Sequence, residues 1–454
     1  MERISNFILL FLLSIFTFVV NGCSSDELCE IEESNNLSTR HTLKMNFEGS
    51  IVGFDQDSTT KTKLRAAMVS SWSEGDKIYI VFSTGTTSVA GEATYSTTTG
   101  WSISYDGELE TGSNLKCEAR YFANATFANS SLVSLNSNSE IYEDLNAIYA
   151  YSDGALTVTA TLSPKTGRLR FTGTAGTVIH TTGISVYTTY SPTTNTFTSS
   201  NATIASTVGT DGYTPYIYGY FTDSDRSLGL VGDDFAFTRT CTSDMFNSGE
   251  SGYMAIPSEE SHNSWRNGLY VKANGVEFKM IPVVGHSDGF FLLAETETTV
   301  ALYNSVFGIS TAPSSPLHPS ECSHAVVLSF ITKINAITSL NFSLPSYSQW
   351  LYAAQGGNQS QGYTYYGSNT PEDIAWYSGN CSSMQNVKTK APNELGLYDM
   401  NGNVEEWTST PYSSNSCFIT CGGSYKSSEI ELLTKNESYY NNGYIGFRLM
   451  LTFK

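Results

Sequence analysis

Two acidic side chains near the end of the sequence have the type and spacing to bind a cation. In the stretch GLYDMNGNVEEW, residues 396–407, Asp399 and Glu406 flank a Gly-Asn turn that ends against a tryptophan. Hard cations prefer carboxylate and backbone carbonyl oxygens at short range. Gly402 allows a sharp turn, so intervening carbonyls can point inward. The stretch therefore predicts a metal loop, with acid–base work on a sugar or a plain turn as the alternatives.

The sequence offers little support for other catalytic, zinc-binding or nucleic-acid-binding functions. The six histidines are scattered, and no GxSxG, HExxH or phosphate-loop pattern is present. The eight cysteines show no CxxC spacing, so we expect no zinc site. A net charge of -19 repels phosphate backbones, and we therefore expect no nucleic-acid partner.

Two helices are expected close to the acidic loop. The stretch LPSYSQWLYAAQGG, residues 344–357, predicts a helix with Ser346 as its N-cap and two glycines as its stop. Residues 320–338 show a helical period in which Val326, Phe330 and Ile334 share one face. Both segments lie after residue 262, in a region without the strand-rich sequence pattern of the part before it.

Four motifs follow one another in this region. They are LPSYSQWLYAAQGG (344–357), DIAWYSGN (373–380), APNELGLYDMNGNVEEWT (391–408) and CGGSYKSS…GYIGFRLML (421–451). In this order they resemble the sulfatase-modifying-factor domain, which is also called the formylglycine-generating-enzyme domain. The resemblance implies an α+β fold like an elaborated C-type lectin, with short irregular strands, two helices and, often, calcium.

The same resemblance implies a set of calcium ligands in the loop. Carried over to this sequence, they are the Asp399 side chain, the carbonyls of Gly402 and Val404, and the Glu406 side chain. Calcium is therefore the expected cofactor. The family's other calcium site needs acids between residues 380 and 391, where this chain has none, so we expect no second ion.

The resemblance also locates the cysteine pair on which the family's oxidase activity depends. The two positions hold Ser427 and Leu432 in this chain. Leucine cannot bind copper, and a hydroxyl is a far poorer ligand for a soft metal than a thiolate. We therefore expect neither copper nor this oxidase activity. Arg448, in the GFR motif, is expected to pair with a buried acid as a structural pin.

Tyrosine-rich segments supply the candidate ligand-binding residues. Tyr365 and Tyr366 lie in GYTYYG, and Tyr439 and Tyr440 lie in ESYYNNGY. A tyrosine ring offers a flat apolar face with a polar tip, which suits stacking on a carbohydrate or contact with a protein. Ordinary packing within a β-rich domain is the alternative.

The N-terminal part predicts export and two β-sandwiches. An apolar run before VVNGC resembles a lipoprotein signal, with Cys23 as the lipidated residue. SSWSEGDKIYIVF (70–82) and IYAYSDGALTVTATLSPKTGRLRFTG (148–173) resemble fimbrillin-like lipoproteins. The expected organisation is a signal peptide at 1–23, a polar tether at 24–44, sandwiches at 45–150 and 151–262, and the sulfatase-modifying-factor domain at 268–454.

Together these features predict a lipid-anchored adhesin or fimbrial accessory subunit at the outer membrane, on the cell surface. Its lectin-like head would bind a glycan or a host or matrix protein, and other fimbrial subunits are further candidate partners. Two alternatives remain open. One is a formylglycine-generating-type or altered periplasmic enzyme. The other is a structural pilus subunit, released for polymerisation by cleavage after Arg40 or Arg65.

Overall fold

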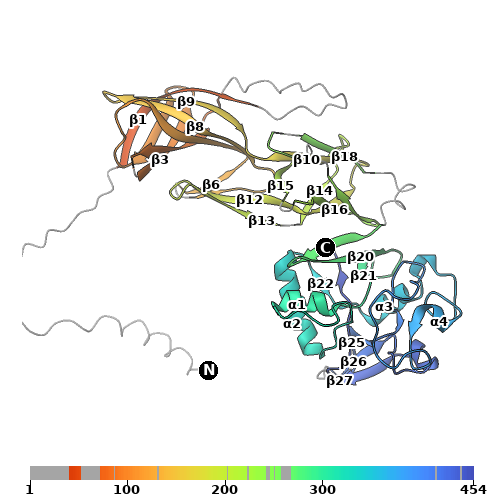
Figure 1. Ribbon diagram of the computed structural model, residues 1–454. Coiled ribbons are helices and arrows are strands. Elements are labelled where there is room, and N and C mark those ends of the chain that lie inside the picture. The colour runs from red at the N-terminus through yellow and green to blue at the C-terminus, as the bar shows by residue number, and fades with distance from the viewer. Residues whose placement is uncertain are drawn as a thin grey trace, which may run out of the picture. The chain divides into compact units, whose positions relative to one another are not determined.

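The computed structural model describes most of the chain from residue 40 onward (Figure 1). The described ranges are 40–52, 72–85, 87–129, 132–201, 203–221, 224–241, 246–249, 251–256, 267–414, 417–439 and 442–453. Cys23, Arg65 and Tyr440 lie outside them. Strands dominate this part of the chain, and its α-helices all follow residue 299, which confirms the mainly β fold class. No helix within these ranges is both long and apolar enough to cross a membrane.

Seven strands close into a barrel in the order β1-β4-β3-β2-β5-β8-β9. Alternate side chains of β9 are buried, namely Leu156, Val158, Ala160 and Leu162, as the two-residue period of a strand requires. The barrel closes where β1 pairs antiparallel with β4 and parallel with β9. The strands are β1 (Arg40–Ile51), β2 (Lys77–Thr84), β3 (Thr87–Ser96), β4 (Gly100–Asp106), β5 (Gly112–Ala123), β8 (Glu140–Ser152) and β9 (Ala155–Pro164).

The expected division between the two β regions at residue 150 falls inside this barrel. Strand β9 lies after that position, yet it pairs with β8 and β1. Conversely, β6 (Thr126–Asn129) and β7 (Leu132–Ser134) lie before it but join a sheet of the second region through β12. Strand pairing between distant segments therefore sets the division, and turn signals along the sequence do not reveal it.

The second β region consists of two sheets around one core, as expected for a sandwich. Leu169 and Phe171 from one sheet meet Ile179, Leu228 and Leu230 from the other. The first sheet has the order β18-β10-β15-β12-β7-β6 with β13 on β12, and the second has the order β14-β11-β16-β17. Their remaining strands are β10 (Gly167–Thr172), β11 (Val178–Thr182), β12 (Ile184–Ser191), β13 (Thr196–Ser200), β14 (Ile204–Thr207), β15 (Ile217–Phe221), β16 (Ser227–Val231), β17 (Ala236–Thr240) and β18 (Ser251–Ala255).

The C-terminal region is α+β and is built on a five-stranded sheet, β19-β20-β21-β28-β22. Two smaller sheets, β23-β24 and β25-β26-β27, complete it. The strands are β19 (Leu269–Ala273), β20 (Val276–Val283), β21 (Phe291–Ala294), β22 (Phe342–Ser343), β23 (Ala375–Trp376), β24 (Asn401–Gly402), β25 (Glu406–Ser414), β26 (Cys417–Cys421), β27 (Asn436–Tyr439) and β28 (Met450–Leu451). The α-helices are α1 (Val300–Phe307), α2 (His324–Thr338), α3 (Tyr347–Ala354) and α4 (Pro371–Ile374).

Both expected helices form, and local signals explain why. Helix α3 begins at a capping box, in which the Ser346 side chain accepts from the Gln349 N–H and the Gln349 side chain accepts from the Ser346 N–H. Helix α2 buries Phe330 and Ile334, as the helical period predicted. Val327 completes that face in place of Val326, which is only half-buried.

Candidate functional site

The acidic loop runs from β24 into β25, and its glycine is required by a close approach of two backbones. Gly402 has a φ of 74°, and a Cβ atom there would lie 2.1 Å from the Trp376 carbonyl oxygen. Its N–H donates to the Gly422 carbonyl at 2.7 Å. The parallel pairing of β24 with β23 thus explains this residue without a metal.

Glu406, one of the two expected calcium-binding carboxylates, is fully buried against Arg448. The Arg448 guanidinium donates to both Glu406 oxygens at 2.6 to 3.0 Å, and the Trp350 indole N–H donates to Oε2 at 2.7 Å. Arg448 also donates to the carbonyls of Ala294 (3.1 Å) and Tyr398 (3.0 Å). The predicted pairing of Arg448 with a buried acid is confirmed. Glu406, the partner of Arg448, is the carboxylate that the sequence assigned to calcium.

Asp399, the other expected carboxylate, is also buried and lies in a group with an acid that the sequence analysis missed. Its Oδ2 accepts the Lys388 N–H at 2.7 Å. Glu297 accepts the Val404 N–H at 3.0 Å and an N–H of the Asn403 side chain at 2.8 Å. The loop is therefore held from a residue more than 100 positions away, which no local motif could reveal.

Crowding of buried acids changes their protonation. Burial raises the pKa of Glu297 well above its usual value, and the charges of Asp399 and Glu406 raise it further. Burial also raises the pKa of Asp399 to about 6, although the Lys388 N–H and Arg448 oppose the shift. Three carboxylates share one guanidinium, so the charge of the group is balanced when two of the acids are protonated.

The expected calcium ligands lie in this arrangement, where one of them already has a cationic partner. A cation bound to Glu406 would have to displace or face the Arg448 guanidinium, which already occupies both carboxylate oxygens. Within the described ranges, no group of three or more His, Cys, Asp and Glu side chains is placed to hold a metal ion. Glu406 therefore does not fit the role of a calcium ligand, and Asp399, Gly402 and Val404 alone form an incomplete set.

Leu432 and Ser427, at the two positions of the family's cysteines, have packing and hydrogen-bonding roles in this chain. Leu432 is fully buried with Ile374, Ala375 and Tyr377 in an apolar cluster. Ser427 accepts the Ser424 N–H through its hydroxyl at 3.0 Å and so acts as part of a turn.

Buried cysteines among the described residues are poorly suited to thiolate chemistry. The six in the described ranges are free thiols: Cys117, Cys241, Cys322, Cys381, Cys417 and Cys421. Burial raises the pKa of the Cys421 thiol far above its usual range and that of Cys322 to about 12. These two thiols therefore stay protonated at neutral pH, the form that is inert as a nucleophile or metal ligand.

A cavity lined by four tyrosines lies beside helix α3, and we call it the tyrosine pocket. It has a volume of about 560 Å³, and its tyrosines are Tyr347, Tyr363, Tyr365 and Tyr366. Two of these, Tyr365 and Tyr366, were candidate ligand-binding residues. The full lining is Tyr347, Leu351, Gln355, Ser360, Gly362, Tyr363, Thr364, Tyr365, Tyr366, Gly367, Glu394 and Leu433.

The other candidate tyrosines are not part of this lining. Tyr439 lies at the end of the edge strand β27 with 66% of its surface exposed. Tyr440 lies outside the described residues. Tyr363, whose side chain is 43% exposed, was missed as a candidate, although it belongs to the same GYTYYG segment.

One carboxylate in the wall of the tyrosine pocket is incompletely satisfied. Glu394 accepts the Gln361 N–H through Oε1 at 2.8 Å. Its Oε2 is buried and has no hydrogen-bond partner in the part of the chain that the structure describes. Buried polar atoms in folded proteins usually have a hydrogen-bond partner, which an ordered water can supply.

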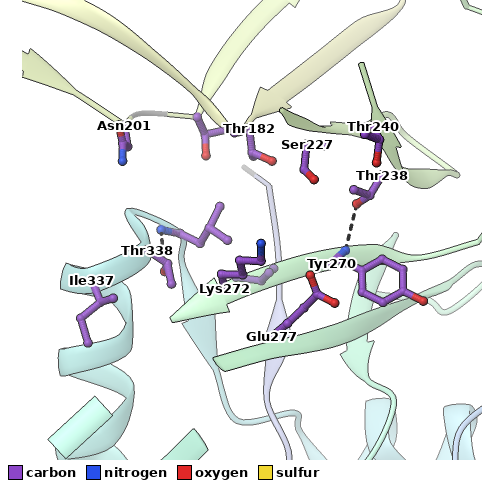
Figure 2. A pocket seen from close by; sticks show the side chains of 15 residues that line it. Thr182, Asn201, Ser227, Thr238, Thr240, Tyr270, Lys272, Glu277, Ile337 and Thr338 are labelled. Carbon is purple, nitrogen blue, oxygen red and sulfur yellow. Dashed lines mark hydrogen bonds between the residues drawn. The ribbon is translucent and has the colours of Figure 1, made fainter. Parts of the chain in front are cut away.

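A second cavity, of about 400 Å³, has a different character (Figure 2). Its wall carries both signs of charge, from Lys272 and Glu277, and Lys272 is paired with Asp225. The Thr238 hydroxyl accepts the Tyr270 N–H at 2.9 Å, which Figure 2 marks with a dashed line. Tyr270 is the one aromatic residue of the lining, so this cavity offers less ring surface than the tyrosine pocket.

Residues 302–453 match the family described as the sulfatase-modifying factor enzyme 1-like domain. The resemblance seen in the four motifs is thereby confirmed, and the chain carries this domain. A protein from Paenibacillus barcinonensis described as chaperone protein LppX is 36% identical over 110 residues. That alignment covers 19% of this chain and 39% of the relative, so well under two thirds of the relative's length is matched.

Two solved structures are also similar to this chain. Treponema denticola variable protein 1 is 22% identical with a TM-score of 0.37, covering 41% of this chain and 99% of its own. A fimbrial protein from Bacteroides ovatus is 10% identical with a TM-score of 0.27, covering 91% of this chain and 100% of its own. Both TM-scores lie below 0.5, and the matched domain and its geometry are therefore the basis of what we propose.

Proposed function

We propose that the sulfatase-modifying-factor-type domain of this chain is the ligand-binding head of a surface adhesin or fimbrial accessory subunit. The tyrosine pocket is its binding site, and a glycan or a host or matrix protein is its ligand. The mainly β region before residue 256 carries the head, and a lipid on Cys23 anchors the chain to the outer membrane. Other fimbrial subunits are further partners in this proposal.

The observation that carries the proposal is the convergence of four tyrosines on one cavity. Its volume of about 560 Å³ is within the range of about 300–1,000 Å³ that is usual for ligand sites. Tyrosine supplies large, rigid contact area at low cost in side-chain entropy, which is why it dominates binding surfaces. Glu394 adds a polar group that can fix the orientation of a ligand.

Oxidation of a substrate cysteine is the less favoured alternative. Leu432 and Ser427 occupy the two cysteine positions, and one is buried while the other caps a turn. A copper-dependent oxidase without its thiolates has no ligand set for the metal. Turnover of a cysteine-containing peptide in the presence of copper would support the enzyme alternative and count against a purely binding head.

The test is an array of glycans and matrix proteins probed with residues 24–454. Tyr363→Ala removes an exposed ring from the pocket, and Tyr412→Ala is its matched control. Tyr412 is 51% exposed and lies on β25, away from the pocket lining. We expect hits that Tyr363→Ala weakens at least about tenfold, by losing a contact at the centre of the site, and that Tyr412→Ala preserves.

A blank array from folded protein would overturn the proposal. So would hits that survive Tyr363→Ala, because they would place the binding surface elsewhere. In the first case, cleavage after Arg40 or Arg65 followed by laddered oligomers would favour the structural pilus subunit.

A further inference from the structure

We infer that the tyrosine pocket selects a positively charged ammonium group, presented by a lysine side chain of a protein ligand. The inference rests on the proposed function and narrows its ligand from a glycan or a protein to a basic protein segment. Three features of the pocket carry it: the negative charge of its lining residues, its tyrosine rings and its apolar walls.

The lining residues themselves carry a net negative charge, and the exposed Lys435 lies against the lining over the Tyr347 ring. The twelve lining residues include Glu394 and no lysine, arginine or histidine. The structure records no ion pair for Glu394 among the described residues, and its buried Oε2 has no hydrogen-bond donor there. An ammonium group brings the opposite charge to this carboxylate, whereas a neutral hydroxyl brings none, and a contact with the buried Oε2 requires the Glu394 side chain to turn toward the pocket.

The aromatic faces of the pocket suit the same group. Ammonium groups bind over the faces of tyrosine rings within about 6 Å of the centroid, and cages of such rings recognise cationic ligands. One lining ring already makes this contact, because the Lys435 Nζ lies 5.3 Å from the centroid of Tyr347. Lys435 is exposed, so it can leave this ring, and it competes with any ligand ammonium for the same face.

Acidic groups continue beyond the pocket on the side of Tyr365. The Tyr365 hydroxyl donates to Glu429 at 3.4 Å. Tyr377 connects Glu429 at 3.3 Å with Glu372 at 2.6 Å. Lys390 donates to the Glu372 carbonyl and lies over the Trp376 ring, and its charge acts on Glu372. The carboxylate of Glu429 therefore adds to the field that favours a cation.

The apolar part of the wall distinguishes a lysine from an amino sugar. Leu351 and Leu433 line the pocket, and the neighbouring Ile430 is 81% exposed. A lysine side chain carries a stem of methylene groups that packs along such surface while its charged end stays in a polar site. A sugar would bring several hydroxyls to these leucines, where they would lose their hydrogen bonds to water.

The test compares two short peptides in titrations of the whole chain by calorimetry. One is acetyl-Gly-Gly-Lys-Gly-Gly-amide, and the other has norleucine in place of lysine, which keeps the stem and removes the ammonium. We expect the lysine peptide to bind about tenfold more tightly, with an affinity that falls as salt rises. Glu394→Gln should abolish that preference. The control, Glu437→Gln, removes an exposed acid of β27 outside the pocket and should preserve it.

Lys435→Met provides a second test, in which binding of the lysine peptide is expected to become tighter. Removal of the competing ammonium over Tyr347 should tighten binding of the lysine peptide several-fold and leave the norleucine peptide unchanged. This gain of binding cannot come from misfolding. Equal binding of the two peptides, or an unchanged preference in Glu394→Gln, would overturn the inference.

Two further outcomes separate this inference from the proposed function. Tighter binding of glucosamine than of the lysine peptide would overturn the lysine assignment and leave the binding head in place. A neutral glycan that binds the wild type but not Tyr363→Ala, without any response to the lysine peptide, would do the same. Absence of any ligand at the pocket in both experiments would overturn the inference and the proposed function together.

Discussion

Replacement of Arg448 by methionine tests the role of the buried pair that holds the acidic loop. Arg448 and Glu406 are both almost completely inaccessible to solvent, and three hydrogen bonds join them. The substitution keeps much of the side chain's length while removing the guanidinium. It leaves Glu406 as a buried carboxylate whose one remaining recorded side-chain donor is the Trp350 indole.

The expected loss of stability is large because the substitution leaves the charged Glu406 buried without its partner. Removal of one partner of a buried ion pair costs about 3–5 kcal/mol. Loss of the hydrogen bonds from Arg448 to the Ala294 and Tyr398 carbonyls adds about 1 kcal/mol each. We therefore expect destabilisation of at least about 4 kcal/mol, which is a large part of the 5–15 kcal/mol that is typical of a domain.

Urea unfolding followed by tryptophan fluorescence measures this loss, since Trp350 donates to Glu406, Trp407 follows Glu406 in the sequence, and both rings are buried. The double variant Arg448→Met/Glu406→Gln should recover at least about 2 kcal/mol, because it removes the stranded charge. Lys333→Met, an exposed substitution on α2, is the control and should stay within about 0.5 kcal/mol of wild type. A loss below about 1 kcal/mol for Arg448→Met would refute the account of the loop.

Three further predictions concern the same domain. Addition of calcium after EDTA treatment should not raise the melting temperature, because the Arg448 guanidinium occupies the Glu406 carboxylate. A rise in melting temperature that Asp399→Asn abolishes would contradict this prediction and support a calcium site in the loop. His324 is stacked on Phe418 at 3.8 Å, and burial lowers its pKa. It contributes stability above its unfolded pKa of about 6.5, which is lost as pH falls through that value and below. His324→Phe should flatten the pH dependence of the melting temperature between pH 7 and 5, and an unchanged slope would exclude this residue as its source. Gly402→Ala should destabilise by more than about 1 kcal/mol, through positive φ and the contact with the Trp376 carbonyl, as measured by urea unfolding; a neutral effect would contradict the close approach.

Elements with local signals were predictable from the sequence. Ser346 and Gln349 form a capping box within one turn, so the start of α3 follows from four residues. Tyr365 and Tyr366 were candidates because tyrosines cluster in one short segment, and both line the pocket. The C-terminal domain was predictable for the same reason, because each of its four motifs is a short continuous stretch of sequence.

Features that depend on distant pairing were not predictable. The barrel boundary depends on β1 pairing with β9, strands more than 100 residues apart, and sequence patterns carry no register over that distance. Glu297 contacts the loop across a similar separation. The identity of the acid that pairs with Arg448 was hidden for the same reason, since Glu406 lies 42 residues upstream.

The central claim is that the tyrosine pocket is the place where the head binds its ligand. Hydrogen–deuterium exchange of the whole chain, with and without the strongest array hit, tests it most directly. We predict that the ligand slows exchange in residues 360–367, most of which line the pocket, and at Leu433 in its wall. Protection confined to the barrel, the sandwich or the cavity of Figure 2, with unchanged exchange at 360–367, would contradict the claim.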